Sequence, residues 1–287
     1  MANKQNLLTK PDIITLGFSP CPNDTFIFDA LVNRRINVNG FQFETYISDV
    51  EDLNRKAFIT ELDVSKLSFG TYLKLVKDYI LLDSGSALGH NCGPLLIAKT
   101  EYSLDDLPNL RIAIPGIHTT ANLLLGFASP LSKNITEMLF SDIEQAVLDD
   151  RVDVGLIIHE SRFTYAQKGL KKLADLGEFW EGSTGFPIPL GGIFVKRSIG
   201  RERIRKINKL IRESIEFAYA NPTEGWSYIK NWAQETADDV IRKHIDLYVN
   251  DYSISLGKEG RNAIEVLFAK AKEAGIADLS GDLFYIP

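Results

Sequence analysis

The sequence predicts an α/β fold with two lobes and a ligand cleft between them. Segments with the pattern of strands alternate with segments with the pattern of helices from Ile13 to Ile158, which is typical of a mostly parallel sheet. Two apolar strands, near Ala98 and near Gly192, flank an internal α/β unit. The chain has 287 residues, which is long enough for two domains with separate cores.

The first α/β unit opens with an apolar strand at 13–18, which runs into a turn rich in proline and capping residues at 19–24. Asp24 or Thr25 is expected to cap the apolar helix that follows. The remaining elements of this unit are predicted as strand 41–47, helix 49–59, strand 64–67, helix 70–76 and strand 79–82.

The second unit lies between two strands that cross from one lobe to the other. Its predicted elements are strand 93–99, strand 107–114, turn 116–121, helix 122–127, a helix and a buried strand within 140–158, and the returning strand 190–196. From Arg201 onward the pattern is helical, with helices expected at 201–220, 226–232, 237–249 and 258–274. Residues 1–97 and 193–287 are therefore predicted to form one lobe and residues 98–192 the other. This is the layout of type II periplasmic binding proteins, with hinges near Ala98 and Gly192.

Composition and charge narrow the class of partner. The net charge is −6 and no block of Lys and Arg occurs, so we expect no nucleic-acid partner. No apolar stretch approaches the length that spans a bilayer, so we expect no membrane partner. The first residues lack the apolar core of a signal peptide, and Cys21 and Cys92 lie far apart outside any CxxC spacing. Reduced thiols in the cytoplasm are therefore expected.

Several strand ends carry polar residues that could bind a small anionic ligand. In the turn at 19–24, Ser19 and Asn23 precede or begin a helix, where free backbone N–H groups favour anions. The turn at 116–121 repeats this arrangement in the second lobe with Thr119, Thr120 and Ala121. In both turns the competing interpretation is simple helix capping.

A third strand of the first lobe ends in Lys66, Leu67 and Ser68. The lysine and the serine could hold acidic or hydroxyl groups of a ligand, and a solvated lysine is an equally good interpretation. The three loops together predict a small-molecule, carboxylated ligand.

His159 follows a buried apolar strand directly and is the candidate catalytic base, because imidazole titrates near neutral pH. Glu160 or a neighbour could orient it, and a structural role is the competing interpretation. His90, His118 and His244 are weaker candidates. No metal-ligand spacing and no GxGxxG, GxxxxGK[ST] or GxSxG motif occurs, so no metal and no cofactor are predicted.

Four segments taken together resemble the 1,4-dihydroxy-6-naphthoate synthase family of the futalosine route to menaquinone. They are SPCPNDTFIF at 19–28, KLS at 66–68, HTTA at 118–121 and GLIIHESRFTY at 155–165. The resemblance covers nearly the whole chain. It implies a carbon–carbon lyase that converts cyclic dehypoxanthinyl futalosine into 1,4-dihydroxy-6-naphthoate and a three-carbon sugar fragment.

The resemblance also implies roles for residues. His159 stands at the proton-acceptor position of the family, and 66–68 with Thr120 and Ala121 stand at its substrate-binding segments. Two alternatives remain at this stage. One is chorismate dehydratase of the same pathway, which shares the fold, and the other is a non-catalytic binding protein for a small carboxylate.

Overall fold

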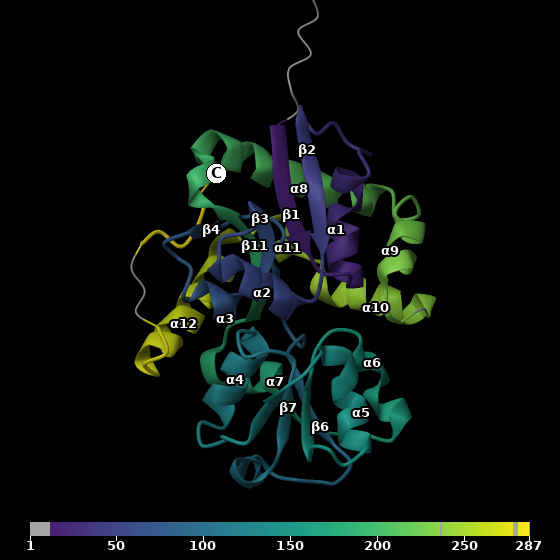
Figure 1. The fold of residues 1–287 in the computed structure, drawn as a ribbon, viewed down its shortest axis with the longest axis vertical. Coiled ribbons are helices and arrows are strands. Elements are labelled where there is room, and N and C mark those ends of the chain that lie inside the picture. Colours follow the sequence, from purple (N-terminus) through teal and green to yellow (C-terminus); the bar gives the residue numbers. More distant parts are fainter. Residues whose placement is uncertain (1–11, 236, 278–280, 287) are drawn as a thin grey trace, which may run out of the picture.

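The computed structural model describes residues 12–235, 237–277 and 281–286. Two β-sheets, each covered by helices, form two lobes stacked along the long axis of the molecule (Figure 1). The first lobe carries both the beginning and the end of the described chain, and the second lobe is built from the middle of the chain. This is the two-lobed α/β architecture that the strand and helix pattern predicts.

The first sheet has the strand order β2-β1-β3-β11-β4, with β5 paired to β11. Its strands are β1 (Asp12–Phe18), β2 (Phe41–Ile47), β3 (Val64–Ser68), β4 (Tyr79–Leu81), β5 (Ala87–Gly89) and β11 (Ile188–Lys196). The strands β1, β2 and β3 are parallel, and β11 runs antiparallel to β3, β4 and β5. Parallel strands end at the same edge of a sheet, so the loops that follow β1 and β3 lie side by side.

The second sheet has the order β10-β6-β9-β7-β8. Its strands are β6 (Leu95–Ala98), β7 (Ile112–Ile114), β8 (Ile135–Glu137), β9 (Val154–Ile157) and β10 (Lys171–Asp175). The helices of this lobe are α4 (Thr120–Ala128), α5 (Ile143–Leu148), α6 (Ser161–Thr164) and α7 (Leu176–Thr184). The chain enters this sheet between β5 and β6 and leaves it between β10 and β11, so the strand near Ala98 belongs to the second sheet.

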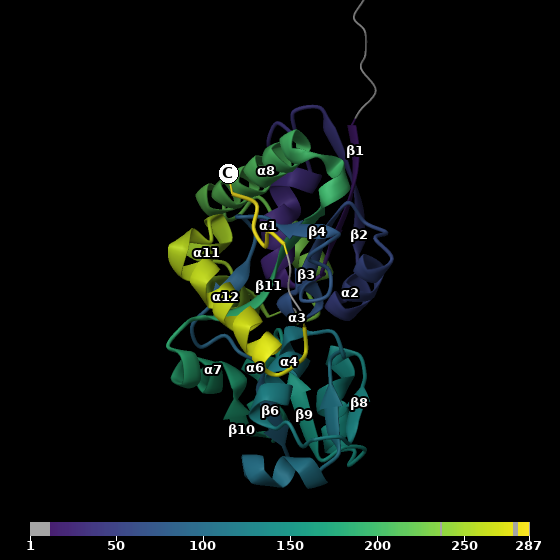
Figure 2. The same ribbon diagram turned by 90° about the vertical axis from the view of Figure 1, so that its left-hand side faces the viewer.

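The helices of the first lobe include a long bundle from the C-terminal third of the chain. They are α1 (Pro22–Val32), α2 (Val50–Phe58), α3 (Phe69–Tyr72), α8 (Arg201–Ala220), α9 (Trp226–Trp232), α10 (Asp238–Tyr248), α11 (Asp251–Ile254) and α12 (Gly257–Glu273). The predicted apolar stripe of α8 is buried against the sheet and α1, where Ser214 Oγ donates to the Ile27 carbonyl at 2.6 Å. Figure 2 shows α12 running from the first lobe toward the second.

The structure shows that the boundaries predicted for two helices and one strand are wrong. The helix expected at 70–76 ends at Tyr72, because tighter i to i+3 bonds follow, such as Leu75 N to Tyr72 O at 2.9 Å. The strand expected at 107–114 is a 3₁₀ helix (Leu104–Asn109) followed by the short β7. The helix expected at 122–127 begins two residues earlier, at Thr120.

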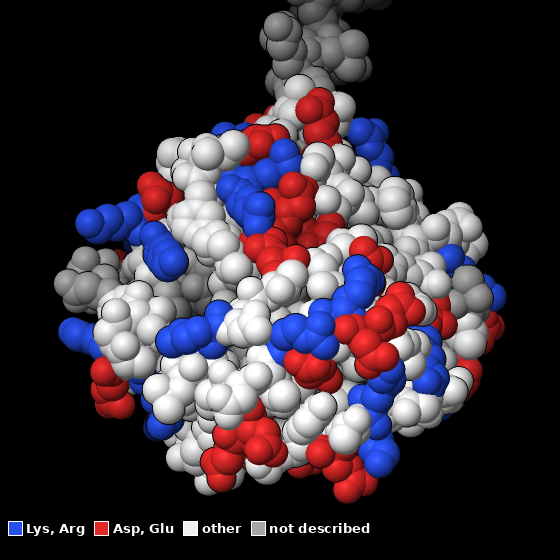
Figure 3. Space-filling model, turned by 60° about the horizontal axis from the view of Figure 1, so that its bottom comes forward, with Lys and Arg blue, Asp and Glu red and all other residues white. Residues whose placement is uncertain are grey.

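On the face drawn in Figure 3, Lys and Arg side chains are interspersed with Asp and Glu rather than gathered into a field of one sign. Among the described residues, no helix combines the length and the apolar character needed to cross a membrane.

Candidate functional site

A cavity with about 670 Å³ of space between its atoms, part of it open to solvent, lies where the two lobes meet. All nine residues predicted as site residues line it: Ser19, Asn23, Lys66, Leu67, Ser68, Thr119, Thr120, Ala121 and His159. The first five come from the ends of β1 and β3 and the start of α1, and the other four come from the second lobe. The structure therefore brings these nine residues together, whereas His118 of the third motif lies outside the cavity lining.

Lys66 is buried and paired, which excludes a solvated lysine. Its Nζ lies 3.0 Å from Asp24 Oδ1, and both side chains are almost fully buried. Lys66 Nζ also donates to the Gly85 carbonyl at 3.2 Å. On the other side, Asp24 Oδ2 accepts from the backbone N and the Oγ of Ser19, at 3.1 and 2.8 Å. A buried charge pair of this kind places a fixed cation and a fixed carboxylate at the cavity wall.

The expectation that Asp24 or Thr25 caps α1 is wrong. The helix begins at Pro22 with Cys21 in the capping position, because proline fits the first helical turn, where its missing N–H costs nothing. The Asp24 side chain does not cap the helix and pairs with Lys66 instead. Sequence reasoning missed this pair because the two residues lie on different elements.

In the second lobe, the loop before α4 contacts both lobes. Thr119 Oγ1 caps the helix by accepting from Asn122 N at 3.2 Å, as the capping interpretation predicted. Thr120 Oγ1 accepts from Gly70 N at 3.1 Å and donates to the Leu190 carbonyl. The backbone N–H groups of Thr120 and Ala121 lie in the first turn of α4, where no helical acceptor is available for them.

His159 is held in an unusual backbone conformation at the end of β9. Its φ is +58°, in the left-handed region that non-glycine residues rarely adopt. Its Nε2 is buried and has no hydrogen-bond partner. Burial lowers the pKa of His159 to about 4, with Asp24 opposing this shift and Lys66 adding to it. The imidazole is therefore neutral at neutral pH and offers a lone pair.

Two further polar side chains lie beside His159. In the sequence, His244 was only a weak candidate for the base, and Glu160 was one of several residues that could orient His159. His244, from α10, is fully buried and its Nε2 lies 2.9 Å from Asn23 Oδ1. Glu160 is almost fully buried, and neither of its carboxyl oxygens has a hydrogen-bond partner. Burial raises the pKa of Glu160 to about 7 and lowers that of His244 well below its usual value.

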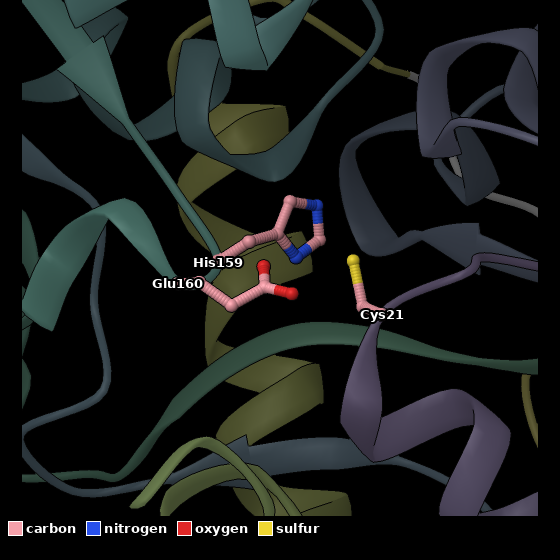
Figure 4. Close-up of side chains that lie close together, drawn as sticks. All are labelled: Cys21, His159 and Glu160. Carbon is pink, nitrogen blue, oxygen red and sulfur yellow. The ribbon is translucent and has the colours of Figure 1, made fainter. Parts of the chain in front are cut away.

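Cys21, His159 and Glu160 gather at one point between the lobes, as Figure 4 shows. One polar atom from each lies within 4.8 Å of the others, and these are atom types that zinc accepts. Metal binding requires the deprotonated thiolate and carboxylate. Burial instead raises the pKa values of both Cys21 and Glu160, which favours their neutral forms. In the metal-free cluster, the thiol and the carboxylic acid are therefore neutral hydrogen-bonding groups.

The two lobes and the cavity between them form the periplasmic-binding-protein-like fold. The ligand-binding component of an ABC-type import system from Staphylococcus aureus shares this fold, with a TM-score of 0.69 over 96% of both chains at 13% identity. A crystal structure of an Archaeoglobus fulgidus protein, 36% identical, superimposes with a TM-score of 0.87 over 92% of this chain and 98% of its own.

A family model described as menaquinone biosynthesis matches residues 14–273. Two relatives named 1,4-dihydroxy-6-naphthoate synthase align over most of the chain. The Thermus thermophilus protein is 43% identical over 93% of this chain and 96% of its own, and the Streptomyces coelicolor protein is 38% identical over 94% and 96%. The chain belongs to the menaquinone-biosynthesis family that includes these two synthases, and it is an enzyme of menaquinone biosynthesis. The resemblance seen in the motifs is confirmed.

Proposed function

We propose that this enzyme is a carbon–carbon lyase that converts cyclic dehypoxanthinyl futalosine into 1,4-dihydroxy-6-naphthoate and releases a three-carbon sugar fragment. His159 acts as the general base. The observation that carries the proposal is a neutral imidazole, with an unpaired Nε2, in a cavity lined by all nine predicted residues. The names of the two relatives support the product, 1,4-dihydroxy-6-naphthoate, and the substrate and the sugar fragment are taken from the family resemblance.

The chemistry needs little beyond what the cavity contains. A retro-aldol-like cleavage requires proton removal and no net redox change, and the aromatic product supplies the driving force. Nε2 of His159 can take the proton because the imidazole is neutral. Lys66 and the free N–H groups at the start of α4 can stabilise negative charge that develops on substrate oxygens.

Closure of the lobes around the substrate is part of the proposal. The two lobes were predicted to be residues 1–97 with 193–287 and residues 98–192. The crossings between the two sheets lie instead between β5 and β6 and between β10 and β11. Movement about these two crossings would close the lobes on the cavity and exclude water from the reacting atoms. Contacts between the two sheets support a closed form: Thr71 Oγ1 donates to the His118 carbonyl at 2.8 Å, and Glu51 Oε2 accepts from His118 N at 3.2 Å. His118 itself lies outside the cavity lining, with its ring against Phe58.

The direct test is turnover with two substrates. Purified enzyme is incubated with cyclic dehypoxanthinyl futalosine and, separately, with chorismate, and the products are identified by mass spectrometry. We expect 1,4-dihydroxy-6-naphthoate from the first and no reaction with the second. Turnover of chorismate would replace the proposal with a dehydratase, and binding without turnover of either would indicate a receptor.

We expect the substrate carboxylate to be anchored by backbone N–H groups of Thr120 and Ala121. Thr120→Pro removes one donor, and proline is tolerated at the first position of a helix. Because this change also removes the Thr120 hydroxyl, Thr120→Val is the matched control, which loses the hydroxyl and keeps the N–H. KM should rise at least several-fold more for the proline variant than for the valine variant. Equal KM values would rule out the backbone anchor.

We also expect no metal requirement, because one base and oriented hydrogen-bond donors are sufficient for the proposed cleavage. Dialysis of the enzyme against a strong chelator should leave kcat unchanged, and zinc added afterwards should not raise it. A loss of activity that zinc restores would instead make Cys21, His159 and Glu160 the ligands of a catalytic metal.

We place the enzyme in the cytoplasm. Cys21 and Cys92 are both buried as free thiols, which suits a reducing compartment. Recovery of the native enzyme in the cytoplasmic fraction of its cells would support this location, and recovery outside the inner membrane would contradict it.

A further inference from the structure

A chain of buried polar side chains leads from the Lys66–Asp24 pair to His159, and each member fixes the hydrogen-bond role of the next. The Asp24 carboxylate accepts from Ser19 and faces Lys66 Nζ, so it acts as an acceptor. Asn23 must therefore turn its amide NH₂ toward Asp24 Oδ1, at 2.9 Å, and its Oδ1 toward His244.

The orientation of Asn23 determines the tautomer of His244. Asn23 Oδ1 can only accept, so His244 Nε2, at 2.9 Å, carries the proton and donates it. In the neutral ring, Nδ1 is then a bare acceptor. This Nδ1 is buried without a partner and faces Glu160 Oε2 at 3.9 Å, which also has no partner.

Two acceptors cannot face each other in a buried site without a proton between them. Their separation of 3.9 Å is about 0.7 Å beyond hydrogen-bond range, so a small movement would pair them once one carries a proton. His244 already uses one proton toward Asn23, and its complete burial, which lowers its pKa well below the usual value, disfavours a second proton on Nδ1. The proton between the two groups therefore belongs to Glu160. The burial that raises the pKa of Glu160 to about 7 acts in the same direction.

The remaining oxygen of Glu160 is available to His159. Figure 4 shows one ring nitrogen of His159 turned toward the Glu160 carboxyl group and the Cys21 sulfur, while the other nitrogen points away from both. The nitrogen on the near side is the one beside the ring carbon that carries the side chain, which is Nδ1. A neutral carboxylic acid presents a carbonyl oxygen as well as a hydroxyl, so it can accept from one histidine while it donates to another.

We infer that Glu160 is a positioning residue that works as a neutral acid: its hydroxyl donates to His244 Nδ1 and its carbonyl oxygen accepts from His159 Nδ1–H. This arrangement leaves His159 Nε2 unprotonated, in agreement with its lack of a partner. The role differs from that of an ionised carboxylate beside a catalytic histidine, because here the neutral form does the orienting. The consequence for turnover rests on the proposed function, whereas the tautomer assignment does not.

The decisive comparison is between Glu160→Gln and Glu160→Leu. Glutamine reproduces both roles of the neutral acid, since its NH₂ donates to His244 and its carbonyl accepts from His159. Leucine has a similar size and reproduces neither. We expect Glu160→Gln to keep kcat within about tenfold of the wild type, and Glu160→Leu to lose about 10²-fold or more with a much smaller change in KM.

The second readout needs no substrate. Nitrogen-15 NMR of histidine-labelled enzyme distinguishes the two neutral tautomers. We expect His159 protonated on Nδ1 and His244 on Nε2 in the wild type and in Glu160→Gln, and a mixed His159 tautomer in Glu160→Leu. In Cys21→Ala, both histidines should have the same tautomers as in the wild type. This result would show that the thiol is not the partner of His159.

Two results would overturn the inference. If Glu160→Gln were as inactive as Glu160→Leu while both remained folded, the ionised carboxylate would be the working form. If His159 were protonated on Nε2 in the wild type, Glu160 would not orient it as inferred. Wild-type enzyme that shows the expected tautomers but does not turn over the proposed substrate would count against the function and not against the positioning role.

Discussion

Replacing His159 with asparagine is expected to lower kcat by about 10²–10⁴-fold, which is the usual contribution of a positioned general base. Asparagine keeps a hydrogen-bonding group at the site but cannot accept a proton near neutral pH. It also tolerates the left-handed backbone at φ +58° better than most residues do. Substrate affinity should fall much less, because the predicted anchors lie on other loops.

His159→Ala serves as the companion variant. It should lose a similar share of kcat, and it should also lose some stability, because alanine gives up the ring contact with Phe140 (4.9 Å between centroids) and tolerates φ +58° less well than histidine does. Turnover and thermal unfolding are measured together for both variants. Near-normal kcat in a folded His159→Asn enzyme would show that another group, with Lys66 and His118 as the next candidates, removes the proton.

The pH dependence of the wild type provides an independent check on the same base. With the pKa of His159 at about 4 in the folded enzyme, the fall of kcat on the acid side should begin only as the pH drops toward 4. The folded pKa lies below the unfolded one, so the unfolded chain binds the extra proton more readily. The stability linked to His159 is therefore complete above the unfolded pKa near 6.5 and is lost as pH falls through about 4. In His159→Asn this acid sensitivity should be smaller.

The sequence predicts the elements that build the site better than the elements at the periphery. Strands β1, β3 and β9 are short apolar runs that end in polar residues, and these patterns depend on local sequence alone. The strand β8 was missed because all three of its residues are exposed, so no alternation marks it. The strand β5 is three buried residues that become a strand only by pairing with β11.

For the site, the sequence indicates single residues but not their partners. Lys66 and His159 stand out because each is a polar residue in or just after a buried strand: Lys66 lies within β3, and His159 comes two residues after β9. His244 lies within an ordinary amphipathic helix, α10, and only the packing of that helix against the loop after β1 brings it to Asn23. The pairings of Lys66 with Asp24 and of Glu160 with His244 join different elements, so they follow from tertiary structure and have no local signal.

The fold alone does not separate an enzyme from a transport receptor. Import-system binding components share the two lobes at 11–13% identity, so their likeness extends to the fold. In this enzyme the cavity wall contains a buried lysine–aspartate pair and two histidines, and an unpaired glutamate lies buried beside His159. Each buried charge in this group is stable only while its partner is present. The effect on the free energy of unfolding can be measured most clearly by replacing Lys66.

Lys66→Met is expected to lower the free energy of unfolding by about 3–5 kcal/mol. Methionine is similar in length and fills the space of the lysine stem, so the main loss is the positive charge. Removal of that charge leaves Asp24 ionised in the interior, with its remaining contacts from Ser19 and Asn23. Chemical denaturation followed by circular dichroism measures the change.

Two further variants separate the buried charge from other effects of the substitution. Lys196→Met removes a partly exposed lysine whose Nζ lies 3.5 Å from Asp63, and an exposed pair of this kind contributes only about 0–1 kcal/mol. The double variant Lys66→Met/Asp24→Asn removes both charges and should recover a large part of the stability lost in Lys66→Met, because no unpaired ion remains. If Lys66→Met were no more destabilising than Lys196→Met, the Asp24 carboxylate would not depend on Lys66 for its charge, and the polar chain that leads from this pair to His159 would lose its fixed starting point.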